Sequence, residues 1–226
     1  MSKVYKIGII DDHDGIRKTF AQAIRGNSEY EISIEAGNGM ELIRKVSQIH
    51  ASEIPDVLLI DINMPLMDGF ETVAWVKSHL TETKILIMSV YTDEEKVVRL
   101  IKMGVNGYLP KSIGVKDLYD ALSNIIRKGF HYSEFIAEKL LESMKTEIPG
   151  YQATASGIKA IWNSLTENEK RLAQLCCTEL TYEEIAREMK LTAKSVEGQR
   201  KSLFSKCRVN TRVGLVMFLF RNKFIE

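Results

Sequence analysis

The stretch Val57-Leu-Leu-Ile-Asp61-Ile-Asn-Met-Pro65-Leu-Met-Asp-Gly69 decides the fold of the first half of this chain. It begins with four consecutive apolar residues, and such a short run without polar alternation is typical of a strand buried on both faces of a parallel sheet. The carboxylate of Asp61 follows directly. Pro65 then stiffens the loop, and Asp68-Gly69 is a common turn pair. The stretch therefore predicts a buried strand, Val57 to Ile60, that delivers a carboxylate to its carboxyl end.

Four further short apolar runs alternate with amphipathic stretches of helical period. The other expected strands are Lys6 to Ile10, Ile32 to Ala36, Lys84 to Met88 and Gly107 to Leu109. The expected core faces of the helices are Ile16, Phe20 and Ile24, then Val97 and Ile101, and last Leu118, Leu122 and Ile126. This pattern predicts an α/β doubly wound five-stranded parallel sheet with helices on both faces. Ligands of such folds bind at the carboxyl ends of the strands.

Composition agrees with a globular protein and excludes several classes. The chain has 226 residues, 45% of them hydrophobic and 27% charged, which excludes a disordered tail, a collagen-like repeat and a disulfide miniprotein. No stretch approaches the roughly 20 apolar residues of a membrane span, so we expect a cytoplasmic protein without membrane association. The three cysteines form no CxxC pair and the four histidines are scattered, which argues against a zinc site.

The second half of the chain lacks strand patterns and predicts helices. From Trp162 onward we expect a smaller all-α domain of four helices, two of which begin with Thr-x-x-Glu capping boxes at Thr166 and Thr181. Its third helix runs from about Thr192 to Lys206 and its fourth from Thr211 to Phe220. The expected domains are residues 1–130 and 162–226. Between them lies a linker, residues 131–161, with an amphipathic helix marked by Phe135, Leu140, Leu141 and Met144.

Charge is distributed unevenly between these two domains. Residues 1–130 carry 16 Lys and Arg against 18 Asp and Glu, a net charge of −2, whereas residues 162–226 carry 12 against 8, a net charge of +4. The excess is concentrated between Thr192 and Arg212, where six basic residues accompany one acidic residue, Glu197. Such a run is either a solvated face or a surface that binds nucleic acid.

Chemically reactive side chains follow four of the five expected strands. Asp11 and Asp12 follow the first strand, Asp61 the third, Ser89 the fourth and Lys111 the fifth. Three carboxylates that lie close together repel one another unless a hard cation such as Mg²⁺ lies between them. With Mg²⁺ bound, Asp61 can act as a nucleophile toward a phosphoryl group, while Lys111 and Ser89 contact the phosphoryl oxygens.

Together these motifs resemble the flavodoxin-like receiver domain of two-component response regulators. The resemblance covers about residues 4–128 and includes Tyr108-Leu-Pro-Lys111 at the fifth strand. It implies that Asp61 is the phosphoacceptor and that Lys111 and Ser89 assist it. It further implies Mg²⁺ ligation by Asp11, Asp12, Asp61 and the Asn63 backbone carbonyl. Ser89 and Tyr108 would form a switch pair, in which the hydroxyl moves toward the phosphoryl group and the aromatic ring follows.

The helical half resembles the DNA-binding domain of the LuxR/NarL (FixJ) class. The residues that carry this resemblance are Leu165-Thr-x-x-Glu169, Leu180-Thr-x-x-Glu184-Ile-Ala186, Ser195-Val196 and Lys206-Cys-x-Val209. It implies a helix-turn-helix whose second helix enters the major groove of double-stranded DNA. The resemblance implies that Glu197, Gly198 and Lys201 face base edges of the DNA. It implies contacts with phosphates, or positions close to them, for Thr192, Lys194, Ser195, Arg200 and Lys206. The implied dimerisation residues are Val213, Val216, Met217 and Phe220.

Glu197 and Gly198 depart from the usual pattern of this class. A carboxylate near phosphates is unfavourable unless it accepts a hydrogen bond from a cytosine amino group or pairs with Lys201. Glycine inside a helix costs about 1 kcal/mol relative to alanine, which suggests that the helix backbone approaches DNA closely at Gly198.

The expected function is a transcription factor controlled by phosphorylation, not an enzyme beyond phosphorylation and dephosphorylation of its own Asp61. Its partners would be a sensor histidine kinase, double-stranded DNA, a second copy of the chain in the active state, and RNA polymerase. Three alternatives stay open: a receiver that is not phosphorylated, a Mg²⁺-dependent phosphohydrolase, and an adaptor whose helical domain binds another protein. Asn63, two residues after Asp61, argues against the hydrolase, because no second carboxylate is available there as general acid and base.

Overall fold

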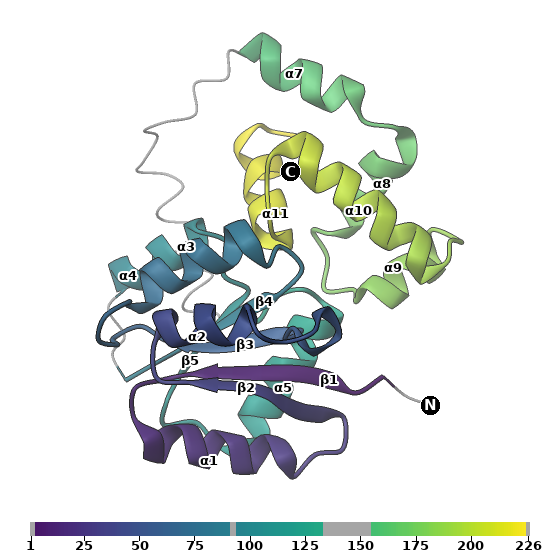
Figure 1. The fold of residues 1–226 in the computed structure, drawn as a ribbon. Coiled ribbons are helices and arrows are strands. Elements are labelled where there is room, and N and C mark those ends of the chain that lie inside the picture. The colour runs from purple at the N-terminus through teal and green to yellow at the C-terminus, as the bar shows by residue number, and fades with distance from the viewer. Residues whose placement is uncertain (1–2, 91–93, 133–154, 225–226) are drawn as a thin grey trace. The chain divides into compact units, whose positions relative to one another are not determined.

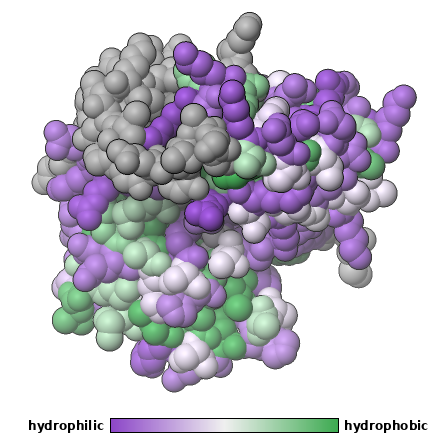
Figure 2. Space-filling model, turned by 90° about the horizontal axis from the view of Figure 1, so that it is seen from above, coloured by the Kyte–Doolittle hydropathy of each residue, from purple (hydrophilic) through white to green (hydrophobic). Residues whose placement is uncertain are grey.

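The computed structural model describes residues 3–90, 94–132 and 155–224. The chain divides into two compact units, Met1–Ile126 and Arg127–Glu226. Within the described residues, no helix is both long and apolar enough to span a bilayer. The face seen in Figure 2 mixes hydrophilic and apolar side chains.

The N-terminal unit is built on a five-stranded sheet in which all neighbouring strands are parallel, in the order β2-β1-β3-β4-β5 (Figure 1). Its strands are β1 (Tyr5–Ile10), β2 (Tyr30–Ala36), β3 (Val57–Asp61), β4 (Lys84–Ser89) and β5 (Gly107–Pro110). All five expected strands are confirmed, each extended by one or two residues at an end. Every residue of β3 is buried, as its unbroken apolar run predicts.

Helices cover both faces of this sheet (Figure 1). They are α1 (Asp14–Arg25), α2 (Gly39–Val46), α3 (Gly69–His79), α4 (Glu94–Lys102) and α5 (Val115–Arg127), with a short 3-10 helix, η1 (Ala51–Glu53), before β3. Helices α1 and α5 share one core with the sheet, in which Phe20, Ile24, Leu118 and Leu122 are buried, as their spacing predicts. Helices α2, α3 and α4 cover the other face (Figure 1).

Strand register places the expected functional residues side by side at one end of the sheet. Ile10 pairs with Ile60, so the residues that follow β1 and those at the end of β3 are neighbours. Asp61 pairs with Met88, the residue before Ser89. The doubly wound fold therefore brings together side chains from separate parts of the sequence.

The C-terminal unit is helical, and its expected helix starts are confirmed. Its helices are α7 (Ala155–Ser164), α8 (Glu167–Leu175), α9 (Tyr182–Glu188), α10 (Ala193–Cys207) and α11 (Arg212–Arg221). Thr166 and Thr181 form the predicted capping boxes, and the Thr192 and Thr211 side chains cap α10 and α11. Helix α7 begins inside the expected linker, whereas the amphipathic piece expected at Phe135 to Met144 lies outside the described residues.

Arg212, in the first turn of α11, is the largest fully buried side chain of this unit. Its guanidinium donates hydrogen bonds of 2.7 to 3.3 Å to five backbone carbonyls. These belong to Lys128, Leu175, Cys176, Thr178 and Leu180. Through these bonds the guanidinium connects the start of α11 to the end of α8, to the loop between α8 and α9, and to Lys128.

One of these five carbonyls shows where the C-terminal unit begins. Lys128 lies directly after α5, and its side chain also pairs with Glu179 at 3.0 Å. Gly129 has a φ of 89°, and a Cβ there would lie 3.2 Å from the Tyr182 ring. Residues 127–130, which the sequence analysis placed in the first domain, thus pack within the C-terminal unit.

Replacing Arg212 should strongly destabilise the C-terminal unit. We expect Arg212→Met to lower its free energy of unfolding by about 3 kcal/mol or more, because buried carbonyls lose a charged donor. Urea denaturation followed by Trp162 fluorescence, in a Trp75→Phe background, measures the effect. The matched control is Arg221→Met, at the exposed end of the same helix, which should change stability by less than about 0.5 kcal/mol. Equal urea midpoints for the two variants would contradict this role of Arg212.

Candidate functional site

Three carboxylates and one ammonium group meet at the carboxyl end of the sheet. Asp11 and Asp61 are buried, whereas Asp12 is partly exposed. Lys111, which follows β5, places its Nζ 2.6 Å from Asp11 Oδ2 and 2.9 Å from Asp61 Oδ2. The four expected residues therefore converge as the strand-end argument predicts.

The backbone around Asp61 is fixed by a close approach of the following loop. The Ile62 amide donates to Asp61 Oδ1 at 2.7 Å, and the Gly69 amide donates to the Ile62 carbonyl at 2.8 Å. A Cβ at Gly69 would lie only 2.4 Å from the Asp61 carbonyl oxygen, so only glycine fits this position. Asp68 and Glu71 form a capping box at the start of α3. The Asp68-Gly69 pair therefore begins helix α3, and its close contact with the Asp61 backbone helps to fix the position of Asp61.

Burial has the largest effect on the pKa of the Asp61 carboxyl group. Loss of water raises the pKa of its carboxyl group above the ordinary value, the Lys111 ammonium partly offsets this, and the Asp11 carboxylate raises the pKa further. Lys111 pairs with two of the three carboxylates, and the Arg17 guanidinium donates to the backbone carbonyl of Asp11.

This donor set fits a hard divalent cation. Ligand atoms of Asp11, Asp12, His13 and Asp61 lie within 4.8 Å of one another. Asp11 Oδ2 is buried, and among the described residues its charged partner is the Lys111 ammonium at 2.6 Å. Carboxylate oxygens grouped in this way suit Mg²⁺, which prefers oxygen ligands. Asn63 is exposed in the loop after β3, and its carbonyl as a further ligand stays a prediction.

His13 is a neighbour of this cluster that sequence reasoning missed. Its amide donates to Asp11 Oδ1 at 2.9 Å, and its Nδ1 lies 2.7 Å from Asp12 Oδ1. The four histidines are scattered along the sequence, and none was expected at the site. The position of His13 could have indicated its role, because a residue directly after Asp12 must lie at the same end of the sheet.

Ser89 and Tyr108 are in contact with each other. Both residues are buried, and their side chains share a hydrogen bond, although burial has the larger effect and raises the pKa of the Tyr108 hydroxyl. The expected switch pair is therefore linked directly in this conformation. Its role in switching stays a prediction.

Helix α10 presents an exposed face that contains the expected base-contacting residues. Lys194, Glu197, Gly198 and Lys201 are exposed, while Val196 and Leu203 are buried in the helical core, as their spacing predicts. A Cβ at Gly198 would have no atom within 4 Å. Packing inside the unit therefore does not require glycine at this position.

Two basic residues expected at DNA are engaged inside the protein. Lys206 Nζ lies 2.7 Å from an oxygen of the buried Glu169, and this contact, with Ser202 and the Thr166 amide, lowers the pKa of Glu169 to about 2 despite its burial. The Arg200 guanidinium lies over the ring of Tyr182, 5.1 Å from its centroid. Contacts of Lys206 and Arg200 with phosphate stay predictions, and each would compete with these internal contacts.

Comparison with known proteins identifies the family of both units. A model of the response regulator receiver domain matches residues 7–123, and a model of the LuxR family of bacterial regulatory proteins matches residues 163–219. The chain belongs to the two-component response regulators of the LuxR/NarL class.

This regulator resembles other response regulators over almost the whole of the given chain. It is 26% identical to the response regulator protein VraR of Staphylococcus aureus, over 98% of this chain and 99% of VraR. Structures of the response regulator RcsB share its fold. One from Salmonella typhimurium has a TM-score of 0.54 at 20% identity, and one of two RcsB dimers bound to two parallel DNAs has 0.56 at 19%. Each RcsB comparison covers 97% of this chain and 99% of the RcsB chain.

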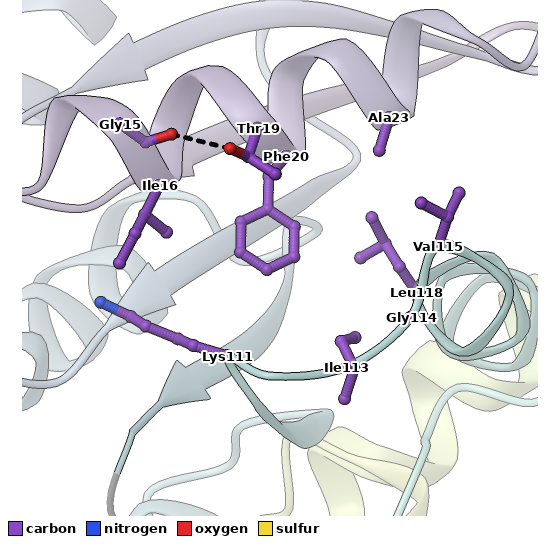
Figure 3. A pocket seen from close by; sticks show the side chains of 10 residues that line it. All are labelled: Gly15, Ile16, Thr19, Phe20, Ala23, Lys111, Ile113, Gly114, Val115 and Leu118. Carbon is purple, nitrogen blue, oxygen red and sulfur yellow. Dashed lines mark hydrogen bonds between the residues drawn. The ribbon is translucent and has the colours of Figure 1, made fainter.

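A pocket of the receiver lies beside the acidic cluster (Figure 3). Helix α1 contributes Ile16 and Phe20 to one wall, and the segment from Ile113 to Leu118 lines the other. Lys111 lines this pocket and also contacts Asp11 and Asp61. The pocket therefore adjoins the residues expected to react.

Helix α11 of this regulator carries the four residues expected at a dimer interface. Val213, Val216 and Met217 are partly buried, and Phe220 is 51% exposed. Their partial exposure is compatible with an interface, and dimerisation through them stays a prediction.

The raised pKa of Asp61 predicts that Asp61→Asn stabilises the receiver in metal-free buffer at neutral pH. Between the ordinary carboxyl pKa of about 4 and the raised folded value, the unfolded chain binds fewer protons, so wild-type stability falls as pH rises. Asparagine does not titrate. The advantage of the variant should grow through this window, to about 1 kcal/mol, and vanish at lower pH.

Urea denaturation followed by Trp75 fluorescence, from pH 3 to pH 8 in the presence of a chelator, measures this dependence. Asp120→Asn, which removes an exposed carboxylate from α5, is the control and should show no such growth with pH. A difference between Asp61→Asn and wild type that does not change with pH would contradict the electrostatic account.

Proposed function

We propose that a partner histidine kinase phosphorylates this regulator on Asp61, with Mg²⁺ bound, and that phosphorylation controls its dimerisation and its sequence-specific binding to DNA. The observation that supports this most directly is the buried Asp61 carboxylate, held against Lys111 beside two further carboxylates. No protein core needs such an arrangement, because uncompensated buried charge is costly.

The transfer requires one bond to form and one to break. A carboxylate oxygen of Asp61 would form a bond to phosphorus, while the bond from phosphorus to the imidazole nitrogen of the phosphodonor breaks. Lys111, already 2.9 Å from Asp61 Oδ2, would pair with the phosphoryl oxygens. Mg²⁺, held by Asp11, Asp12, Asp61 and the Asn63 carbonyl, would neutralise the negative charge that collects at the site.

Ser89 and Tyr108 would transmit the modification to the surface. The Ser89 hydroxyl now shares a hydrogen bond with Tyr108, and it would exchange this bond for a phosphoryl oxygen. Tyr108 would then lose its buried partner and reorient. The two residues would thus couple the chemistry at Asp61 to a change in the shape of the receiver.

The second unit would bind DNA as a homodimer through α10, with α11 in the dimer interface. The structure of RcsB dimers bound to DNA supports this arrangement by similarity of fold. Two-fold symmetry would match two half-sites, and contacts to phosphates would make the affinity fall steeply with salt. Such a regulator acts in the cytoplasm, has RNA polymerase as a further partner, and catalyses no reaction beyond those at its own Asp61.

A small-molecule phosphodonor and Mg²⁺ should add a single phosphoryl group to the wild-type protein. Intact mass spectrometry should show the adduct in wild type and in Asp68→Asn, a conservative change in the same loop that preserves helix capping. The adduct should be absent from Asp61→Asn. If wild type stays unmodified while another receiver in the same reaction is phosphorylated, the receiver is inert and this proposal is wrong.

Gly198→Ala should stabilise the C-terminal unit yet weaken DNA binding. Because the added methyl group meets no atom within 4 Å, the change should raise the free energy of unfolding by about 1 kcal/mol. On DNA the same methyl group would occupy the space of close approach, and affinity should fall several-fold. Urea denaturation and fluorescence anisotropy with labelled DNA measure the two effects, and Ser205→Ala on the same exposed face is the control. A variant with higher stability and undiminished affinity excludes close approach at Gly198.

A further inference from the structure

The exposed face of α10 carries fewer available cations than its sequence suggests. Of the four basic residues in α10, Lys194 and Lys201 are exposed, whereas Arg200 and Lys206 are partly buried against Tyr182 and Glu169. Glu197 lies on the same exposed face. The surface offered to DNA therefore mixes charges of both signs, and a carboxylate there needs a hydrogen-bond donor on the nucleic acid.

Among the described residues, Glu197 pairs with one basic side chain, that of Lys201. Its Oε1 lies 3.6 Å from Lys201 Nζ, one helical turn later, and the two side chains are 55% and 51% exposed. An ion pair this long and this exposed to water contributes little free energy. Glu197 can therefore leave Lys201 for another partner at a small cost in free energy.

We propose that Glu197 and Lys201 break their ion pair on DNA and contact a cytosine and a guanine in the major groove. Glu197 accepts a hydrogen bond from the N4 amino group of cytosine, and Lys201 donates to O6 and N7 of guanine. This proposal rests on the proposed DNA binding and goes further, because it names bases that this chain selects.

Major-groove chemistry favours cytosine over the other bases. Cytosine and adenine are the bases that offer an amino donor there, but adenine presents it beside its own N7 acceptor, which repels a carboxylate. In a C·G pair the acceptor beside the cytosine amino group is guanine O6, which Lys201 can occupy. The two residues lie one helical turn apart on the same face, about 6 Å along the helix axis, which is within two base steps of about 3.4 Å.

Gly198 makes this contact sterically accessible. It follows Glu197 on the exposed face, and within the described part of the chain no atom beyond the neighbouring backbone of α10 lies within 4 Å of the place of a Cβ. The absence of a side chain lets the groove edge approach the helix beside Glu197. The Glu197 side chain then reaches the edge of a base in the major groove.

The test is selection of DNA from a random double-stranded library by the full-length protein, with and without Mg²⁺ and a phosphodonor. Wild type, Glu197→Gln and the control Glu167→Gln, which removes an exposed carboxylate from the start of α8, are compared by sequencing. Wild type and Glu167→Gln should enrich a cytosine at one position of each half-site. Glu197→Gln should replace it with adenine, because glutamine pairs with the N6 and N7 atoms of adenine, and should leave the other positions unchanged.

Affinities on the selected site give the second measurement. Changing that cytosine to adenine should weaken wild type about tenfold or more and should strengthen Glu197→Gln. If Glu197→Gln selects the same sequence as wild type, the assignment of Glu197 is overturned and DNA binding stands. If wild type enriches no sequence, the proposed DNA-binding function is overturned together with the assignment of Glu197.

Discussion

The Lys111 ammonium, held between the buried carboxylates of Asp11 and Asp61, is the interaction on which the functional end of the receiver depends. Two carboxylates this close would repel each other in a site with little water, and the ammonium makes their burial possible. It does not balance the charge completely, since Asp12 adds a third carboxylate. The site is therefore stable enough to fold and still negative enough to attract a cation. Both properties follow from placing one positive charge, and only one, at the end of β5.

The backbone near this cluster is constrained as tightly as the charges. Gly69 lets the start of α3 pack against the carbonyl of Asp61, and the Asp68 capping box holds that helix start in place. Close packing of this kind leaves a reacting side chain little freedom, so orientation is set before any partner arrives. The hydrogen bond between Ser89 and Tyr108 extends the same constraint from the site into the interior. Ser89, at the end of β4, is thereby linked to the buried Tyr108 of β5.

Buried charge also organises the helical unit, with consequences for its surface. Arg212 satisfies five backbone carbonyls, and Lys206 pairs with the buried Glu169. Both contacts stabilise the fold, and the second withdraws a cation of α10 from the surface proposed to meet DNA. What remains exposed on α10 is a small set of side chains of both signs, including Glu197 and Lys201. On a surface of this composition, contacts to phosphates would position the helix, and the match between individual side chains and bases would give the sequence preference.

The sequence by itself determined the strands, the helix starts and the convergence of Asp11, Asp61 and Lys111. Those features depend on local patterns, apolar runs and capping residues, and on the rule that parallel strands end at one edge. It also indicated the exposed face of α10, through helical spacing. Only the tertiary structure decided which charged side chains bind partners inside the protein. Arg212, Arg200 and Lys206 all look like surface cations in sequence, and nothing local distinguishes them from Lys194 or Lys201. Their partners are carbonyls, rings and a carboxylate from distant helices, and such contacts exist only once the helices have packed.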